Sequence, residues 1–360
     1  MISPLHDLIK RVRHDFKLPD IIGERCVYAL LETASCRACI EACPQDAWLL
    51  SDDSLGLDAE ACDGCGLCAP ACPQGAIINH DQAIAIRKWG GKLIALCACE
   101  YTEQASNEGV IPCINSVGLQ DILHLQQRGI QQLLMATADC EQCKRGNKNR
   151  LSDRVASLNA ALQKTHSAGI KLSCLPLDAW QRILSDEAVS PVGPRVDRRN
   201  FLRTLASTNL EYGMKQADSF MLGNAPFVPP GQLIPNPSSQ TLWPYLPIMD
   251  AGRCNGCDAC VKLCPQGAIV LDKADGGGCY RLDPMRCSGC SICVDVCERE
   301  AISIRQWLMQ EQHELGLKDS RCTACGVLFH LPADHTLAEF LLCQICSENN
   351  HYKNLHQVLN

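Results

Sequence analysis

The chain has 360 residues, a formal net charge of −7 and 27 cysteines. The acidic balance argues against a nucleic-acid partner, which would need a concentrated basic face, and without a run of about 18 apolar residues no membrane span is expected. Because the N-terminus lacks an apolar stretch with a cleavage site, we expect a reducing cytoplasm rather than a secreted, disulfide-rich protein.

Residues 1–25 are expected to form an N-terminal amphipathic segment. Its apolar residues recur at helical spacing, with basic residues beside them: Leu5, Leu8, Ile9 and Val12, then Lys10, Arg11 and Arg13. This pattern favours a helix docked on the protein surface over a membrane anchor.

Residues 26–85 contain two cysteine runs. The second run is complete, with the spacing C-x2-C-x2-C-x3-C-P: Cys62, Cys65, Cys68, Cys72 and Pro73. The first run has Thr33 in place of its first cysteine and retains Cys36, Cys39, Cys43 and Pro44. This spacing is typical of iron–sulfur ligands, and Gly64, Gly66 and Gly75 allow the chain to fold tightly around a cluster.

Residues 86–190 alternate between predicted strands and helices. Short apolar runs predict strands at 92–96, 131–136 and 170–175, and helical spacing predicts helices that begin near Leu119 and Leu151. Such alternation is typical of a small parallel α/β domain. Five cysteines accompany these elements: Cys97, Cys99, Cys113, Cys140 and Cys143.

Residues 191–247 are rich in proline, which breaks helices, and are expected to be a linker laid over the surface. Residues 248–308 then repeat the pattern of the first two cysteine runs, which indicates an internal repeat. The repeated cysteines are Cys254, Cys257, Cys260 and Cys264, followed by Pro265, and Cys287, Cys290, Cys293 and Cys297, followed by Glu298.

Residues 309–360 carry two C-x2-C pairs separated by 17 residues: Cys322, Cys325, Cys343 and Cys346. Two such pairs predict a zinc-ribbon-like tail in which four thiolates hold zinc, with a further iron centre as the alternative. His330 and His335 are candidate substitutes, but a lone histidine beside a complete set of four thiolates is expected to be structural. Cys174 and Cys279 have no partner by spacing and are expected to be ordinary residues.

The four runs resemble those of bacterial two-cluster ferredoxins, in which the fourth cysteine of each run crosses to the other cluster. The resemblance implies three complete sets of [4Fe-4S] ligands. These sets are Cys254, Cys257, Cys260 and Cys297; Cys287, Cys290, Cys293 and Cys264; and Cys62, Cys65, Cys68 and Cys43.

The remaining N-terminal site has three evident ligands: Cys36, Cys39 and Cys72. Cys26, seven residues before Thr33, is favoured as the fourth ligand. The alternatives are a three-iron cluster or a non-cysteine ligand, with Cys26 as an ordinary buried residue.

The middle cysteines resemble those of the small iron–sulfur subunit of methyl-viologen-reducing hydrogenases, which hands electrons to heterodisulfide-reductase-type flavoproteins. This resemblance covers residues 88–165 and implies a [2Fe-2S] cluster, for which we favour Cys97, Cys113, Cys140 and Cys143, with Cys99 in reserve. The last two cysteines are closer together than in that family, which leaves the ligand set open. The alternative is reduced structural thiols in a flavodoxin-like domain.

The sequence therefore predicts an α+β multi-domain protein: two ferredoxin-like two-cluster modules, a small parallel α/β domain between them and a zinc-ribbon-like tail. It contains no G-x-G-x-x-G, Walker loop, serine nucleophile motif or histidine cluster, so we expect no catalytic site. The predicted function is electron transfer within a larger oxidoreductase. The expected partner is a catalytic or flavin subunit, such as a hydrogenase, a formate or other molybdenum or tungsten enzyme, or a heterodisulfide-reductase-like flavoprotein. An assembly factor for a metalloenzyme and an iron–sulfur redox sensor are the alternatives.

Overall fold

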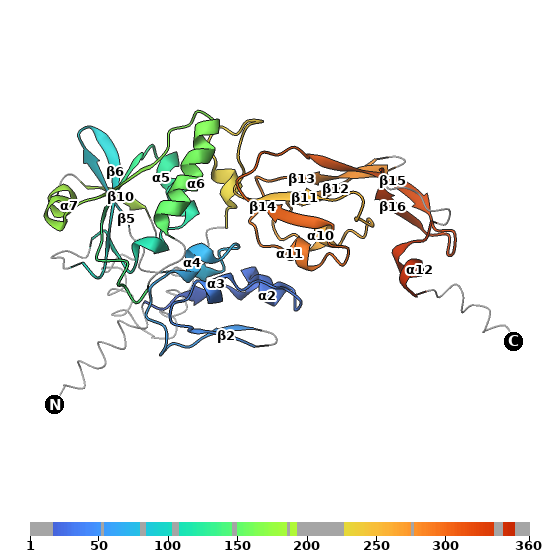
Figure 1. Cartoon of the computed structure of the whole chain (residues 1–360), viewed down its shortest axis with the longest axis horizontal. Helices are drawn as coiled ribbons and strands as arrows, with labels where there is room; N and C mark the ends of the chain where they lie inside the picture. The colour runs from blue at the N-terminus through green and yellow to red at the C-terminus, as the bar shows by residue number, and fades with distance from the viewer. Residues whose placement is uncertain are drawn as a thin grey trace, which may run out of the picture. The chain divides into compact units, whose positions relative to one another are not determined.

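The computed structural model describes residues 17–51, 54–79, 84–102, 108–145, 150–185, 188–192, 227–274, 277–334 and 341–349. Most of the predicted amphipathic segment, and His335, lie outside these ranges. The chain divides into two compact units (Figure 1). One comprises Met1–Glu32, Cys36–Val228 and Leu233–Asn236, and the other comprises Thr33–Ser35, Pro229–Gln232 and Pro237–Asn360.

The first cysteine runs are framed by two short antiparallel strand pairs. β1 (Asp20–Ile21) pairs with β4 (Ile77–Ile78), and β2 (Trp48–Leu50) pairs with β3 (Leu55–Leu57). The intervening helices are η1 (Gly23–Arg25), α2 (Val27–Leu30), α3 (Ala38–Glu41) and α4 (Cys68–Ala71). Cys39 and Cys68 lie on α3 and α4 and are buried with Trp48 and Ile77. The core of this region therefore consists largely of cysteines and the apolar residues around them.

A six-stranded sheet follows, with the order β10-β5-β6-β8-β9 and with β7 paired to β6. Its strands are β5 (Ile84–Trp89), β6 (Lys92–Cys99), β7 (Val110–Ile111), β8 (Gln132–Ala136), β9 (Lys171–Cys174) and β10 (Ala188–Val192). β6, β8 and β9 are parallel, as expected, and the short β7, which was not predicted, is parallel to β6. β5 and β10 are antiparallel, so the sheet is mixed. Gly90 and Gly91 explain why β5 is antiparallel to β6. Both have positive φ, at 55° and 80°, as the two-residue turn of a hairpin requires.

Helices pack on this sheet, and the alternation of side chains decides which strand residues they cover. The helices are α5 (Leu119–Gln127), α6 (Leu151–Lys164) and α7 (Leu177–Leu184). Ile94, Leu96 and Ala98 on β6 pack with Trp180 of α7. Cys97 and Cys99, one residue out of phase, therefore point to the face opposite α7, and Figure 1 shows α5 and α6 on the other side of the sheet from α7.

The second unit repeats the strand pattern of the first cysteine runs. β11 (Leu246–Met249) pairs with β14 (Ile302–Arg305), as β1 pairs with β4, and the hairpin of β12 (Ile269–Ala274) and β13 (Gly277–Leu282) corresponds to that of β2 and β3. The helices α10 (Ala259–Leu263) and α11 (Ile292–Asp295) again begin within the cysteine runs. The structure thus contains the internal repeat that the sequence indicates.

The C-terminal residues extend the second hairpin into a four-stranded antiparallel sheet. β15 (Glu314–Arg321) pairs with β13, and β16 (Leu328–Pro332) pairs with β15. The short helix α12 (Gln344–Asn349) follows. Leu315 and Leu317 of β15 are buried in the same core as Tyr280 and Leu282 of β13. The tail therefore shares a hydrophobic core with the second pair of cysteine runs.

The described end of the proline-rich segment differs from the expected surface linker. Trp243 is 7% exposed, and its backbone N–H donates to the carbonyl oxygen of Leu308 at 2.9 Å. β11 already begins at Leu246, because the apolar side chains of this stretch are buried. Pro229 and Pro230 are also buried, and the 3₁₀ helix η3 spans Pro230–Leu233. Residues 193–226 lie outside the described ranges.

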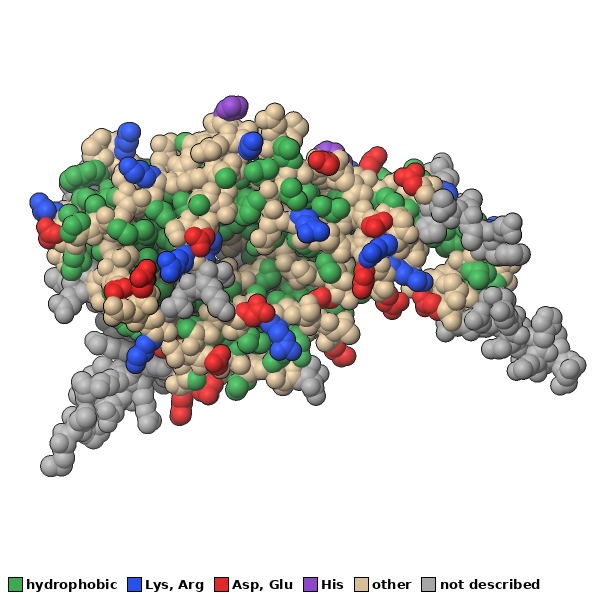
Figure 2. All heavy atoms as spheres, viewed as in Figure 1, with side chains coloured by type: hydrophobic (Ala, Val, Ile, Leu, Met, Phe, Trp, Pro, Cys, Tyr) green, Lys and Arg blue, Asp and Glu red, His purple; other side chains and the backbone are tan. Residues whose placement is uncertain are grey.

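Among the described residues, no helix is long and apolar enough to cross a membrane. On the face drawn in Figure 2, acidic and basic side chains are interspersed. That distribution agrees with a modest net charge of −7.

Candidate metal centres

The second unit contains two hollows, each lined by four cysteines. The first has a free volume of about 300 Å³, partly open to solvent, and is lined by Cys254, Cys257, Cys260 and Cys297. The second has a free volume of about 340 Å³ and is lined by Cys264, Cys287, Cys290 and Cys293. Each hollow thus takes three cysteines from one run and the fourth from the other run. The structure brings together both sets that the ferredoxin resemblance implies.

Apolar side chains complete both hollows. Met249, Tyr280 and Ile302 border the first, and Pro247 and Ile304 border the second. Cysteines converging on a small apolar space form the donor set that holds iron–sulfur clusters through thiolates. The residues present therefore fit such a group.

The fourth cysteine of every run accepts a hydrogen bond from the backbone four residues later. The N–H groups of Ala47, Ala76, Ala268 and Ala301 donate to the Sγ atoms of Cys43, Cys72, Cys264 and Cys297, at 3.4, 3.2, 3.1 and 3.2 Å. The residue before each alanine has positive φ: Asp46 (50°), Gly75 (56°), Gly267 (60°) and Glu300 (49°). The left-handed residue turns the amide toward the sulfur, and such bonds tune the potential of a bound cluster. An alanine at this position in all four runs is a sequence signal that was missed.

The first run departs from the other three in the turn that precedes its helix. In the complete runs, the residue after the second cysteine is left-handed: Gly66 (74°), Asp258 (63°) and Ser291 (63°). Arg37, which follows Cys36 at the corresponding place, has φ −130°. The run that lacks its first cysteine therefore also lacks the loop conformation that the others share.

Cys26 lies beside this divergent run. Burial, with the neighbouring thiols of Cys72, Cys36 and Cys26, raises the pKa of Cys39 to about 12. Burial likewise raises the pKa of Cys72, and Cys26 contributes there too. The chain between η1 and α2 thus places Cys26 within electrostatic reach of two cysteines of the site that lacks a fourth ligand.

The other N-terminal set is assembled in the same way. Burial raises the pKa of Cys62, with further contributions from Asp63 and Cys43. Burial also raises the pKa of Cys68, and Cys65 and Cys62 add to the shift. Cys43, from the first run, therefore lies with the first three cysteines of the second run.

The middle domain gathers its cysteines at the carboxyl ends of the parallel strands. Cys97 of β6, Met135 of β8 and Cys174 of β9 lie in one register row across the sheet. Burial, with smaller contributions from Cys174, Cys99 and Cys113, raises the pKa of Cys97 to about 12. Cys174, which was expected to be an ordinary residue, is therefore a neighbour of the cluster of thiols, because the strand register brings it there.

The loops after β6 and β8 supply the remaining middle cysteines. Burial raises the pKa of Cys113 to about 11, with Cys99 and Cys140 contributing. Cys140 is exposed as a residue, but partial burial of its thiol raises the pKa of this group, with contributions from Cys99, Cys143 and Cys174. All five predicted cysteines and Cys174 thus lie near one another, and the choice of ligands among them stays a prediction.

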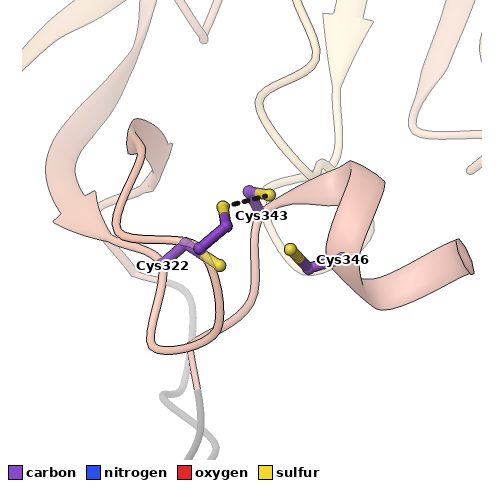
Figure 3. Close-up of side chains that lie close together, drawn as sticks. Cys322, Cys343 and Cys346 are labelled. Carbon is purple, nitrogen blue, oxygen red and sulfur yellow. Dashed lines mark hydrogen bonds between the residues drawn. The ribbon is translucent and has the colours of Figure 1, made fainter. Parts of the chain in front are cut away.

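The four cysteines of the tail form the tightest group. The Sγ atoms of Cys322, Cys325, Cys343 and Cys346 all lie within 4.8 Å of one another (Figure 3). The Sγ atoms of Cys325 and Cys343 are 3.7 Å apart, and zinc–sulfur bonds of about 2.3 Å in a tetrahedron would place sulfurs about 3.8 Å apart. The arrangement fits tetrahedral thiolate coordination of zinc.

Backbone amides favour the thiolate form of Cys322 in this group. Burial opposes ionisation of Cys322, but the N–H groups of Cys343, Cys325 and Ala324 lower its pKa to about 6. His330 does not belong to the group: its Nε2 lies 2.9 Å from Oδ1 of Asp258 and 3.1 Å from the hydroxyl of Tyr280.

Two parts of the chain match known protein families. Residues 34–77 match one model of a 4Fe-4S dicluster domain, and residues 253–301 match another. The chain carries two 4Fe-4S dicluster domains. The first match begins after Cys26, so it says nothing about that residue. No curated protein matches the chain.

Proposed function

We propose that this protein is a multi-cluster electron-transfer subunit of a larger cytoplasmic oxidoreductase, whose catalytic or flavin subunit is a separate chain. Two dicluster domains indicate iron–sulfur electron transfer. The observation that carries the proposal is the pair of four-cysteine hollows in the second unit, each built from both cysteine runs. Crossed ligand sets place two clusters beside each other, as stepwise electron transfer requires.

We assign four [4Fe-4S] clusters, two in each dicluster domain. The two hollows hold the C-terminal pair, and the N-terminal ligands are Cys43, Cys62, Cys65 and Cys68 for one site and Cys26, Cys36, Cys39 and Cys72 for the other. The proximity of Cys26 to Cys39 and Cys72 supports its role as the fourth ligand. A three-iron cluster would replace the cubane if Cys26 were not a ligand.

The bound clusters would supply reversible one-electron chemistry. The polypeptide holds the thiolates at fixed positions, surrounds them with apolar side chains and directs backbone N–H groups at the crossing cysteines. These N–H groups stabilise negative charge on sulfur, so they favour the more reduced state. The protein therefore sets the reduction potentials of the clusters and the path of the electrons between them.

We further propose a [2Fe-2S] cluster in the middle domain and zinc in the tail. The resemblance to the small hydrogenase subunit supports the first, and thiols at the carboxyl ends of β6, β8 and β9 are suitably placed. Four sulfurs within 4.8 Å support the second. Because the tail shares the core of the second unit, its zinc would be structural.

Anaerobic purification of the full chain tests this function. Four cubanes and one two-iron centre predict about 18 iron and about 18 sulfide per chain, with about one zinc. Titration with a one-electron reductant should bleach the visible absorption reversibly, and the electrons should pass to a co-purifying flavin or metal subunit. A colourless protein, or one that holds only zinc, would overturn the proposal.

A further inference from the structure

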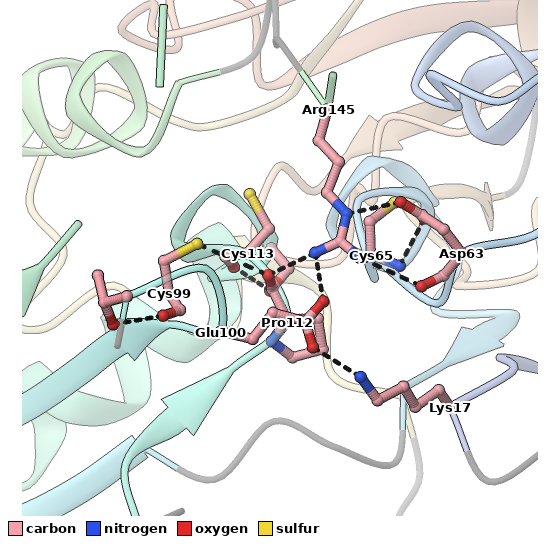
Figure 4. A network of polar contacts seen from close by, with 10 residues as sticks. Lys17, Asp63, Cys65, Cys99, Glu100, Pro112, Cys113 and Arg145 are labelled. Atoms are coloured by element: carbon pink, nitrogen blue, oxygen red, sulfur yellow. Dashed lines mark hydrogen bonds and ion pairs between the residues drawn. The ribbon is translucent and has the colours of Figure 1, made fainter. Parts of the chain in front are cut away.

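A buried arginine joins the first dicluster domain to the middle domain within the first unit. Arg145 follows Cys143 by two residues, and its side chain is 4% exposed. Figure 4 shows its guanidinium between the loop of Asp63 and the strand end at Glu100 and Pro112. Each of these partners lies next to a predicted cluster ligand.

The guanidinium makes directed contacts on both sides. Its Nε donates to Oδ2 of Asp63 at 2.6 Å, and its Nη2 donates to the backbone carbonyl of Asp63 at 3.2 Å. Its Nη1 contacts Oε1 of Glu100 at 2.6 Å and the carbonyl of Pro112 at 2.7 Å. The ring of Tyr101 stacks 4.6 Å from the guanidinium carbon.

The network is balanced in charge. The second carboxylate oxygen of Glu100 lies 2.6 Å from Nζ of Lys17, so two cations face two anions. A buried charge that is fully paired and hydrogen-bonded is tolerated, whereas removal of one partner leaves the others uncompensated. Arg145 therefore holds the position of its neighbours more firmly than a surface ion pair would.

One residue on each side connects Arg145 to a predicted cysteine ligand. The other oxygen of Asp63 accepts from the backbone N–H of Cys65 at 3.1 Å. On the opposite side, Pro112 directly precedes Cys113. Cys65 and Cys113 themselves pack in one buried cluster with Leu67. Cysteines from two separately predicted centres thus belong to one buried cluster.

We propose that the buried cluster of Cys65, Leu67 and Cys113 is an electron-transfer junction, and that Arg145 is the positioning residue that fixes the spacing of its two centres. The proposal rests on the proposed function. One electron leaves the cluster at Cys43, Cys62, Cys65 and Cys68, which is oxidised, and enters the centre that includes Cys113, which is reduced, or the reverse. No bond is made or broken, and no proton is transferred.

The chemistry of the guanidinium explains why arginine occupies this place. Its planar fork contacts Asp63, Glu100 and Pro112 at once, whereas a lysine ammonium would keep the charge but lose the fixed geometry. The positive charge also stabilises the more negative, reduced state of both centres. Geometry and charge can therefore be separated by substitution.

The test uses the full chain, loaded anaerobically and reduced with a viologen or dithionite. When all centres are paramagnetic, the wild-type electron paramagnetic resonance spectrum should show spin–spin broadening beyond that of the neighbouring pair of N-terminal clusters, and Cys113→Ser should remove this additional part while the N-terminal clusters remain. Arg145→Gln should shift the one-electron reduction equilibrium of the N-terminal cluster about tenfold toward the oxidised state, which is about 59 mV, and weaken the broadening. Arg145→Lys should restore most of the potential but not the broadening.

Arg87→Gln is the matched control. Arg87 has a side chain that is 3% exposed and pairs with Glu108 at 2.8 Å, and it donates to the carbonyl of Leu184 at 2.7 Å. Its loss should reduce stability without moving the potential or the broadening. If Arg145→Gln does not fold, the wild-type, Cys113→Ser and Arg145→Lys spectra decide the question.

Two outcomes would overturn the junction: equal broadening in wild type and Cys113→Ser in proteins whose clusters load and reduce, or an Arg145→Lys or Arg145→Gln spectrum and potential equal to wild type. A wild-type protein without reducible clusters would instead overturn the proposed function. The two failures are therefore distinguishable.

Discussion

The hydroxyl of Tyr280 donates a hydrogen bond of 2.6 Å to Oδ1 of Asp258, a residue inside the loop between Cys257 and Cys260. Tyr280 is 1% exposed and borders the same hollow as these cysteines. The bond withdraws negative charge from a carboxylate beside a proposed cluster. It therefore links the core of the sheet to the electrostatics of the first C-terminal site.

Tyr280→Phe should lower the reduction potential of that cluster, because Asp258 loses its hydrogen bond from Tyr280 and keeps the contact with His330, so its negative charge disfavours an added electron more strongly. Asp258→Asn should raise the potential, since it removes the charge. Loss of the hydrogen bond to a charged group should also cost about 1.5–3 kcal/mol of stability. Redox titration followed by electron paramagnetic resonance measures both shifts. Equal potentials in the two variants and the wild type would show that Asp258 does not influence the cluster.

Cys26→Ser should damage one N-terminal cluster and leave the others intact. If Cys26 is the fourth ligand, its loss should leave a three-iron cluster or an empty site, so that iron falls by about one to four atoms per chain. Cys279→Ser is the control, because Cys279 on β13 borders neither hollow. Metal analysis and the spectrum of the oxidised protein distinguish a three-iron cluster from an empty site. An unchanged spectrum for Cys26→Ser would reject the ligand role.

The cysteine spacing predicted much of the site, because cluster ligands close to one another in sequence leave a local pattern. The resemblance of these runs to two-cluster ferredoxins implies the crossed sets at Cys254–Cys297, and the short apolar runs predict the strands β6, β8 and β9. The antiparallel strand β5 was missed, although Gly90 and Gly91 are a hairpin signal. The pattern of short apolar runs alone does not give strand direction.

Other features depend on contacts between residues far apart in sequence, and no local pattern reveals them. Arg145 and Asp63 are separated by 82 residues. Cys174 approaches Cys97 because β8 and β9 pair in a particular register. His330, weighed as a metal ligand, bonds Asp258 because β16 lies at the edge of a sheet that the sequence did not predict.

Gly256→Ala should disrupt the first C-terminal site. Gly256 has φ 70°, and an added Cβ would collide with the backbone carbonyl of His330, which cannot move as a flexible side chain can. The control is Gly267→Ala in the other site, where φ is 60° and the Cβ would meet only the end of the Arg286 side chain, at 3.2 Å. Both variants carry the left-handed penalty of about 1–2 kcal/mol, so the difference isolates the collision.

We expect Gly256→Ala to lose about four iron atoms per chain, one cubane, whereas Gly267→Ala should retain them. Iron analysis after anaerobic purification is the measurement. Equal iron contents in the two variants would mean that the contact with His330 does not constrain the cysteine loop.

Zinc binding to the tail should depend on pH, because the thiols of its four cysteines do not share one pKa. Burial opposes ionisation of Cys322, yet backbone N–H groups lower its pKa to about 6, so it is largely thiolate at pH 7. Burial raises the pKa of Cys343 and of Cys346, so these thiols are protonated there. Because zinc takes thiolates and Cys322 is already largely ionised, binding at pH 7 should release fewer than four protons.

The sign of the pH effect follows from the same values. Below pH 6 Cys322 gains a proton, so zinc binding should weaken and proton release should approach four. Calorimetric titration of zinc into the chelator-treated full chain, in buffers of different ionisation enthalpy, counts the protons. Cys279→Ser, a change outside the four-cysteine group, should give the wild-type count. Release of four protons at pH 7 would show that Cys322 is not a preformed thiolate, and the backbone amides would then have no part in preparing the site for metal.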